Sequence, residues 1–287
     1  MKEILLENAR RNAALADDPD PVTGDASDPT RVPYSFGGKT YWIPAEMLDD
    51  PKLRLAASER DLARLRFRYD FPFWAVSCVV ITDKISSRDI PFRLNRPQRR
   101  LAALLEAERR AGHPLRLIML KARQWGGSTL IQIYFAWIQI IHCRGWNSLI
   151  CAHVKDTSAT IRGMYSRLLA RYPEEYWEEE VKPEFRPFER MTNTRVIPGR
   201  ECKVTVCSSE NQEATRGQDY ALAHLSEVAF WKDSPLHNPA DLLRSVTSGI
   251  ASKPLSFIAM ESTANGTGNF FHREWMRACT PGRSDKI

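Results

Sequence analysis

LIMLKARQWGGST, residues 117 to 129, carries the strongest structural signal in the chain. Its apolar first part, Leu117 to Leu120, is typical of a short buried strand. Polar and glycine residues then turn the chain, and the apolar run from Leu130 to His142 predicts a helix. Backbone N–H groups converge at such a turn, and together with the helix dipole they favour a bound phosphate. Ser128 or Thr129 would add the hydroxyl that a phosphate-bound Mg²⁺ needs as a ligand.

The turn departs from the usual phosphate-binding pattern, Gly-x4-Gly-Lys-Ser/Thr. When Gly126 is placed on the second glycine, Lys121 falls where the first glycine belongs and Gly127 falls where the lysine belongs. The loop still needs a cation against the phosphates, so we expect Lys121 to supply it with help from Arg123. The alternative is an ordinary strand-to-helix turn that carries surface basic residues.

Composition sets wider limits on the class of protein. The 287 residues suffice for one large or two modest domains, and 43% hydrophobic with 26% charged residues is ordinary for a soluble globular protein. The net charge of +6 permits a polyanionic partner without requiring one. The six cysteines include no Cys-x-x-Cys pair, which indicates thiols in a reducing compartment. The most apolar window, 130–141, is too short to span a bilayer, and we expect no membrane contact.

We divide the chain into an N-terminal arm with a lid-like subdomain, residues 1–90, and a main domain, residues 91–287. The first part contains the turn-forming run Asp17–Pro21 and an amphipathic stretch, Leu53–Tyr69. The second part opens on a helix that begins at Gln98. A glutamine amide there can present one donor and one acceptor to the edge of an adenine, although glutamine is also common at helix starts.

A second group of polar residues follows the apolar strand that starts at Tyr220 and ends at Leu225. Ser226 and Glu227 come next. In enzymes with a phosphate-binding loop, a strand beside that loop carries one acidic residue for the metal and one carboxylate for the attacking water. Here the usual Asp-Glu pair is Ser-Glu, so Glu227 is the candidate base and Ser226 could hold a metal-bound water. A glutamate at a strand end is also common without any function.

Two further features complete the pattern. Arg216, beside Gly217, could reach a phosphate bound by a neighbouring subunit, and the alternative is a surface arginine in a turn. A third strand, Leu255–Met260, runs into Glu-Ser-Thr-Ala-Asn-Gly. Small polar residues there can sense a γ-phosphate, and Asn265 is the only side-chain amide in that turn. An ordinary polar turn is the alternative.

In this order and spacing, the residues resemble the ATPase domain of a tailed-bacteriophage terminase large subunit, the motor that packages DNA. The resemblance spans roughly residues 90 to 280. It implies an α/β fold: a three-layer, RecA-like P-loop NTPase of the ASCE class with a mostly parallel central sheet and an N-terminal lid-like segment. Members of this family often carry the basic residue at the start of the loop, as Lys121 does. The Ser226 substitution departs from the commoner aspartate.

The resemblance also implies site residues, with ATP and Mg²⁺ as cofactors. Glu227 would be catalytic, with Arg216 acting in trans. Metal ligands would come from Ser128, Ser226 and Glu227, and coupling residues from Ser262, Thr263 and Asn265. The expected nucleotide-binding residues are Gln98, Lys121, Arg123, Gln124, Gly126, Gly127, Ser128 and Thr129.

The implied function is ATP hydrolysis that drives double-stranded DNA into a procapsid. The implied partners are the DNA, a portal protein and a terminase small subunit. The chain would form a pentameric ring on the procapsid in the host cytoplasm, be absent from the mature virion and be a monomer in isolation. Because the chain stops at Ile287, before an RNase H-type nuclease domain, we expect no DNA cleavage by it. The alternatives are another P-loop DNA translocase or helicase-like ATPase, and a nucleotide-binding docking module without hydrolysis.

Overall fold

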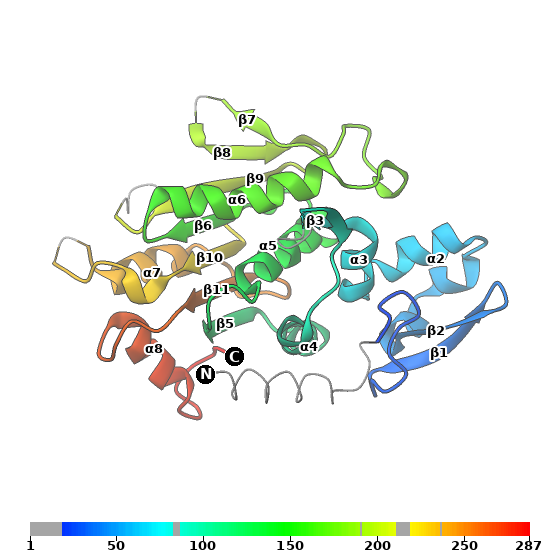
Figure 1. Ribbon diagram of the computed structural model, residues 1–287, viewed down its shortest axis with the longest axis horizontal. Helices are drawn as coiled ribbons and strands as arrows, with labels where there is room; N and C mark the ends of the chain where they lie inside the picture. Colours follow the sequence, from blue (N-terminus) through cyan, green and yellow to red (C-terminus); the bar gives the residue numbers. More distant parts are fainter. Residues whose placement is uncertain (1–18, 83–86, 190, 211–218, 236) are drawn as a thin grey trace. The chain divides into compact units, whose positions relative to one another are not determined.

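The computed structural model describes residues 19–82, 87–189, 191–210, 219–235 and 237–287. The chain divides into two compact units, Met1–Phe73 and Trp74–Ile287. Figure 1 shows the secondary structure of both units, with the sequence running from blue to red. A helix of eight residues, α3 (Phe71–Cys78), spans the boundary.

The first unit is built on an antiparallel hairpin and short helices. Its elements are β1 (Arg31–Phe36), β2 (Lys39–Pro44), the 3-10 helices η1 (Ala45–Asp49) and η2 (Pro51–Leu55), and α2 (Glu59–Arg66). Their apolar faces share one small core of Ile43, Met47, Leu53, Leu62 and Leu65. The amphipathic stretch is thus divided in two, because Ser58 accepts a hydrogen bond from the Asp61 amide and caps a new helix.

Asp70 holds this unit together through two arginines. Its carboxylate accepts hydrogen bonds from Arg31 at 2.7 and 2.8 Å and from Arg66 Nε at 2.7 Å, and it is fully buried. Arg66 also donates to the backbone oxygens of Pro21 and Val22, which fixes the segment before the hairpin. Burial would raise the pKa of Asp70, but the charges of Arg66 and Arg31 outweigh burial and lower it.

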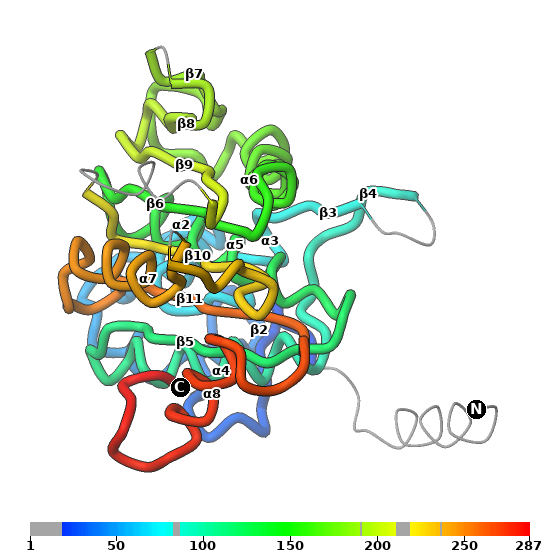
Figure 2. Tube along the Cα trace, turned by 90° about the vertical axis from the view of Figure 1, so that its left-hand side faces the viewer, coloured from blue at the N-terminus to red at the C-terminus, as the bar shows by residue number. Residues whose placement is uncertain are grey.

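The second unit contains a seven-stranded sheet in the order β5-β11-β10-β6-β9-β8-β7. The first five strands in this order are parallel, and the last two pair antiparallel at one edge. Figure 2 shows the strands following one another from β7 down to β5. The strands are β5 (Leu115–Leu120), β6 (Ser148–Ala152), β7 (Arg186–Phe188), β8 (Met191–Ile197), β9 (Cys202–Ser208), β10 (Leu222–Ser226) and β11 (Phe257–Ser262).

Helices cover both faces of this sheet. On one face, Phe135 of α5 packs edge-on against Phe257 of β11, with ring centroids 5.2 Å apart. On the other face, α7 and α8 bury Leu242 and Phe270 in one cluster with Met260 of β11. The described helices of this unit are α4 (Arg96–Arg110), α5 (Gly127–Trp137), α6 (Lys155–Ala170), α7 (Pro239–Ser248) and α8 (Phe270–Ala278).

The predicted fold class is therefore confirmed: an α/β domain with a mostly parallel central sheet between helical layers. A small hairpin, β3 (Val80–Thr82) with β4 (Asp89–Pro91), lies outside the main sheet. The remaining short elements are η3 (Ile138–His142), η4 (Glu174–Tyr176), η5 (Pro198–Arg200) and η7 (Val228–Phe230). Within the described part of the chain, every helix falls short of the length and apolarity needed to cross a bilayer.

Two strand boundaries differ from the sequence-based expectation, and both differences concern the site. β10 continues to Ser226 and β11 continues to Ser262, so Ser226 and Glu261 are strand residues rather than turn residues. Both are buried. Parallel strands end at the same edge of a sheet, so the ends of β5, β10 and β11 bring their polar residues together.

Candidate nucleotide-binding site

The loop after β5 opens directly onto the N-terminus of α5. Gly126 caps this helix with φ +85°, and a Cβ there would lie 2.5 Å from Gln98 Nε2, so only glycine fits. Gln124 also has a positive φ of 65°, which is uncommon for a residue with a side chain. The helix begins at Gly127, three residues before the apolar run that predicted it. Its first N–H groups have no partner within the helix and face the loop.

Gly127 stands where a standard phosphate-binding loop has its lysine, and packing closes this position. A Cβ at Gly127 would lie 2.7 Å from the Trp125 ring and 3.1 Å from Met119 Cε. A lysine could enter only if the Trp125 ring moved. The cation of such a loop therefore has to come from another position.

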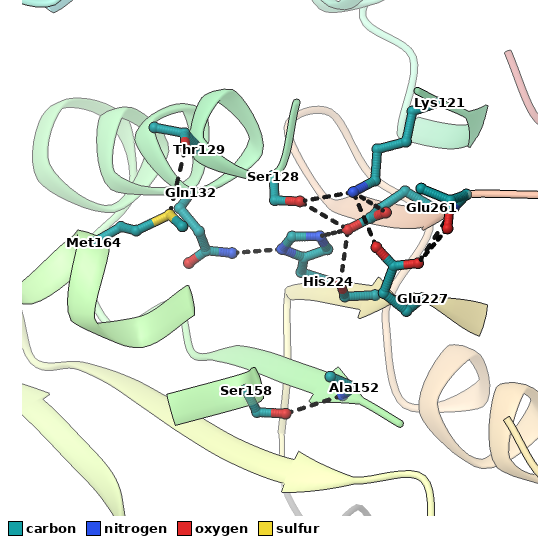
Figure 3. Close-up of polar contacts among 12 residues, drawn as sticks. Lys121, Ser128, Thr129, Gln132, Ala152, Ser158, Met164, His224, Glu227 and Glu261 are labelled. Carbon is teal, nitrogen blue, oxygen red and sulfur yellow. Dashed lines mark hydrogen bonds and ion pairs between the residues drawn. The ribbon is translucent and has the colours of Figure 1, made fainter. Parts of the chain in front are cut away.

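Lys121 at the start of the loop points into a cluster of polar side chains (Figure 3). Its ammonium group lies 3.0 Å from Glu261 Oε2 and 3.3 Å from Glu227 Oε1, and it donates to Ser128 Oγ at 3.3 Å. Burial by itself would lower the pKa of Lys121, but the two carboxylates raise it above its ordinary value. Lys121 is thus a charged, nearly buried cation between the loop and the strand ends.

Glu261 is the centre of this cluster, and the sequence analysis gave it no role. One oxygen, Oε1, accepts from Ser226 Oγ at 2.7 Å, Ser128 Oγ at 2.9 Å and His224 Nε2 at 3.2 Å. Its side chain is 0% exposed. Burial raises the pKa of this carboxyl, but the hydrogen bond and charge of His224 and the charge of Lys121 bring it down to about 2.

His224 was missed as well, and a second buried residue fixes its role. Gln132 Nε2 lies 2.8 Å from His224 Nδ1, and an amide nitrogen can only donate. His224 Nδ1 is therefore the acceptor, and Nε2 carries the proton that points to Glu261. A histidine in an otherwise apolar strand was the signal in the sequence, because a fully buried histidine needs polar partners.

Glu227, the candidate base, follows β10 in a left-handed conformation, with φ 54° and ψ 43°. This region is unfavourable for a residue with a long side chain, and such strain is common at functional sites. Its Oε2 accepts hydrogen bonds from the amide and the hydroxyl of Thr263, at 3.3 and 3.1 Å. The conformation aims the carboxylate back toward the loop and away from α7.

The other two coupling candidates contact the backbone immediately after Glu227. Ser262 Oγ accepts a hydrogen bond from the Ala229 amide at 3.1 Å, and Asn265 Nδ2 donates to the Ala229 oxygen at 2.9 Å. Together with Thr263, these residues tie the end of β11 to the segment that carries Glu227. The turn after the third strand is therefore mechanically joined to the second group of polar residues.

Gln98 lies beside the loop, but its amide is engaged in a different way from the one expected. Its Oε1 accepts from the Asn95 amide at 2.9 Å, which completes a capping box at the start of α4. Its Nε2 donates to the Gly126 oxygen at 3.0 Å. Gln98 thus connects α4 to the loop, and contact with a base would need a further lone pair or proton of the same amide.

The structure separates the remaining candidates. Ser128 points at the carboxylates, whereas Thr129 Oγ1 lies against Met164 Sδ at 3.4 Å, so Ser128 is the hydroxyl placed for a metal (Figure 3). Arg123 and Gln124 are exposed on the loop. Arg216 lies outside the described residues.

A cavity of about 970 Å³ opens beside the loop. It is large enough for a nucleotide, and its polar lining includes Arg93, Asn95, Gln98, Lys121 and Arg167. Apolar residues of β3, α5 and α6 complete the wall, namely Val80, Ile133, Met164 and Leu168. The cavity therefore combines a phosphate-binding loop with an apolar surface suited to a ring.

The described residues contain no cluster of three or more His, Cys, Asp or Glu side chains that could hold a metal by itself. Mg²⁺ bound with a nucleotide needs fewer protein ligands, because phosphates and water fill most of its six positions. Ser128 Oγ and Glu261 are hard oxygen donors at the loop, and Glu261 Oε2 accepts no well-oriented hydrogen bond. The donor set therefore fits a Mg²⁺ that arrives with phosphates.

No family model matches the chain, and no curated protein matches it. Solved structures do: the large terminase of bacteriophage HK97 has 14% identity over 75% of this chain and 41% of its own, with a TM-score of 0.55. A variant ATPase domain of the large terminase of Thermus phage P74-26 has 16% identity over 68% and 79%, with a TM-score of 0.42. A large terminase from a thermophilic bacteriophage, in complex with ADP, has 12% identity over 64% and 42%, also with a TM-score of 0.42.

The first of these similarities shows that the main part of this chain has the fold of a region of the HK97 terminase. The chain spans less than half of the length of that protein.

Proposed function

We propose that the chain is the ATP-hydrolysing motor domain of a viral terminase large subunit, which moves double-stranded DNA into a procapsid. The observation that carries the proposal is the connected network at the strand ends. Lys121 of the loop contacts Glu227, and Glu227 contacts Thr263, so one chain of contacts runs from the phosphate-binding loop to the coupling turn. The fold similarity to a phage large terminase supports the same reading.

Each residue has a defined part in this proposal. The amides of residues 126–129 bind the phosphates of ATP, and Lys121 leaves the carboxylates to contact the β- and γ-phosphates. Ser128 is a ligand for Mg²⁺, which neutralises charge on the phosphates. Glu227 accepts the proton of the attacking water or orients it. The wall of the cavity receives the base and ribose, with Gln98 at its edge.

Coupling follows from the contacts of Glu227. Any shift of Glu227 toward the γ-phosphate changes its hydrogen bonds to Thr263, and Ser262 and Asn265 transmit the change through Ala229. The end of β11 thereby registers whether the γ-phosphate is present. Arg216, supplied by a neighbouring subunit, would make hydrolysis depend on assembly into a ring. We assign residues 91–287 to the motor domain and residues 1–90 to an N-terminal arm with a lid-like role.

The proposed setting is the portal of a procapsid in the cytoplasm of an infected bacterium. The partners would be double-stranded DNA, a portal protein and a terminase small subunit, with five copies of the chain in the ring. The pI near 9.0 suits a DNA partner. Two other functions would use the same site: a different DNA translocase or helicase-like ATPase, and a docking module that binds nucleotide without hydrolysis.

ATP turnover by the purified chain, with and without double-stranded DNA, tests the proposal. We expect turnover that requires Mg²⁺ and is lost in Glu227→Gln, while ATP binding in a titration stays close to the wild-type value. ATP binding without turnover in the assembled ring would instead indicate the docking module. DNA uptake by procapsids, measured as protection from nuclease, separates a packaging motor from a strand-separating helicase.

A further inference from the structure

The strand that should carry a metal-binding carboxylate carries a serine, and the neighbouring strand carries the carboxylate instead. Ser226 on β10 and Glu261 on β11 are register partners, so their side chains lie on the same face of the sheet. Ser226 Oγ donates to Glu261 Oε1 at 2.7 Å. The carboxylate is therefore displaced by one strand spacing, about 4.8 Å, toward the strand that leads into the phosphate-binding loop.

The two oxygens of Glu261 have different surroundings. Three donors, Ser128, Ser226 and His224, converge on Oε1. Oε2 is buried and accepts no well-oriented hydrogen bond, and its counter-charge is the Lys121 ammonium at 3.0 Å. A fully buried carboxylate is costly unless a cation stays beside it. Lys121 is therefore needed by Glu261 in the structure and by the phosphates in the proposed ATP complex.

We propose that Glu261 is the carboxylate that positions Mg²⁺ in this site, in place of the acidic residue that Ser226 has replaced. When Lys121 turns to the phosphates, Glu261 receives the Mg²⁺ that ATP brings with it as its new cation. Ser128 lies between the two, since its hydroxyl already contacts both Lys121 Nζ and Glu261 Oε1. This inference rests on the proposed function, because it concerns the same ATP site.

The exchange of cations has a measurable consequence. Without metal, ATP must draw Lys121 away from Glu261 and leave a buried carboxylate with His224 as its remaining charged partner or donor. Metal-free ATP should therefore bind weakly, and Mg²⁺ should strengthen binding by a large factor. Glu261→Gln has no buried charge to compensate, so it should bind metal-free ATP at least as tightly as the wild type while losing the gain from Mg²⁺.

The test is the dissociation constant of ATP, measured by calorimetry once with excess Mg²⁺ and once with EDTA. We expect Glu261→Gln to reduce the ratio of the two constants by about 10- to 100-fold. The matched control is Glu106→Gln on α4, which removes another buried glutamate, one held by Tyr134 at 2.6 Å and by Arg109. This control should leave the ratio unchanged.

Equal shifts of both constants in Glu261→Gln would overturn the inference, because they would mean that Glu261 only orients Lys121. Absence of ATP binding in the wild type would overturn the proposed function itself. If Glu261→Gln does not fold by circular dichroism, Glu261→Asp replaces it: the charge remains but the carboxylate withdraws, and the ratio should still fall. The exchange variant Ser226→Asp with Glu261→Ser should recover the Mg²⁺ dependence, and a folded, ATP-binding exchange variant without recovery counts against the inference.

Discussion

Glu227 and Thr263 are joined by two hydrogen bonds to one carboxylate oxygen, from the Thr263 amide at 3.3 Å and from its hydroxyl at 3.1 Å. The first residue follows β10 and the second follows β11, so the contact crosses between neighbouring strand ends. It connects the proposed base with the turn proposed to couple hydrolysis to movement. The left-handed backbone of Glu227 is what permits this contact, since it turns the side chain back across the sheet edge.

Thr263→Val should lower kcat for ATP hydrolysis about tenfold and leave the dissociation constant of ATP nearly unchanged. One hydrogen bond to a charged group contributes about 1.5–3 kcal/mol, of which only the part that orients Glu227 affects the reaction. Thr263→Ser keeps the hydroxyl and is the control. Steady-state turnover together with an ATP titration checks the prediction, and equal loss in both variants would contradict it.

Lys121→Met should weaken ATP binding by at least about tenfold, because the loop loses the cation that we assign to the phosphates. The variant should also be less stable, since Glu261 keeps its buried charge and loses its counter-charge. Lys52→Met, at an exposed lysine of the first unit, is the control. Near-wild-type affinity in a folded Lys121→Met protein would show that another group supplies the cation.

The sequence predicted the loop, the strand-to-helix order and the position of Glu227 because each depends on local pattern. It could not identify Glu261. A glutamate followed by small polar residues is typical of a turn, and its partners, Lys121 and Ser226, are far away in the chain. They meet only because β11 lies between β5 and β10 in the sheet, and strand order is set by packing rather than by local sequence.

Gln98 and Gly127 show the same limit at smaller scale. The sequence identified Gln98 as a residue near the nucleotide, but its capping box with Asn95 depends on where α4 begins. The mismatch at Gly127 was evident from the pattern, whereas its physical basis, the contact with the Trp125 ring, required coordinates. Residue types can be read from the chain, but the atoms already engaged by neighbours cannot.

Gly126→Ala should destabilise the protein and weaken ATP binding. The new Cβ would lie 2.5 Å from Gln98 Nε2, and the φ of +85° is unfavourable for alanine, a cost of about 1–3 kcal/mol. Gly163→Ala, within α6, is the matched control: its nearest neighbour is an Arg167 side-chain nitrogen at 3.7 Å. This control should raise stability by up to about 1 kcal/mol, because alanine favours a helix. Urea unfolding checks both variants.

Acid should destabilise the first unit through Asp70. The folded-state pKa of Asp70 is lowered, because the charges of Arg66 and Arg31 outweigh burial, so the unfolded chain binds its proton more readily. Its stabilisation is complete above the unfolded pKa of about 3.9 and is lost as the pH falls below it. Asp70→Asn should cost about 3–5 kcal/mol at neutral pH, since it leaves two arginines without their partner. Urea midpoints of the variant should also change less than the wild type between neutral and acidic pH.

Arg216 and Glu227 should complement each other between subunits. Arg216 lies outside the described residues, and its assignment comes from the sequence. Arg216→Ala should reduce turnover about 10³-fold or more, the usual effect of losing an arginine finger. Glu227→Gln should be inactive for a different reason. In a mixed ring, an Arg216→Ala subunit keeps its glutamate and can receive an arginine from a Glu227→Gln neighbour, so about one quarter of the interfaces in an equal mixture become complete.

The mixture should therefore hydrolyse ATP although each variant alone does not, and activity should peak near equal proportions. An arginine that acts within its own subunit predicts the opposite, because no subunit in the mixture holds both residues. Light scattering must first confirm that the mixed ring assembles, since a monomeric chain has no interface to complete. An assembled but inactive mixture would remove Arg216 from the proposed site and leave Lys121, Ser128, Glu227 and Glu261 as the residues to explain turnover.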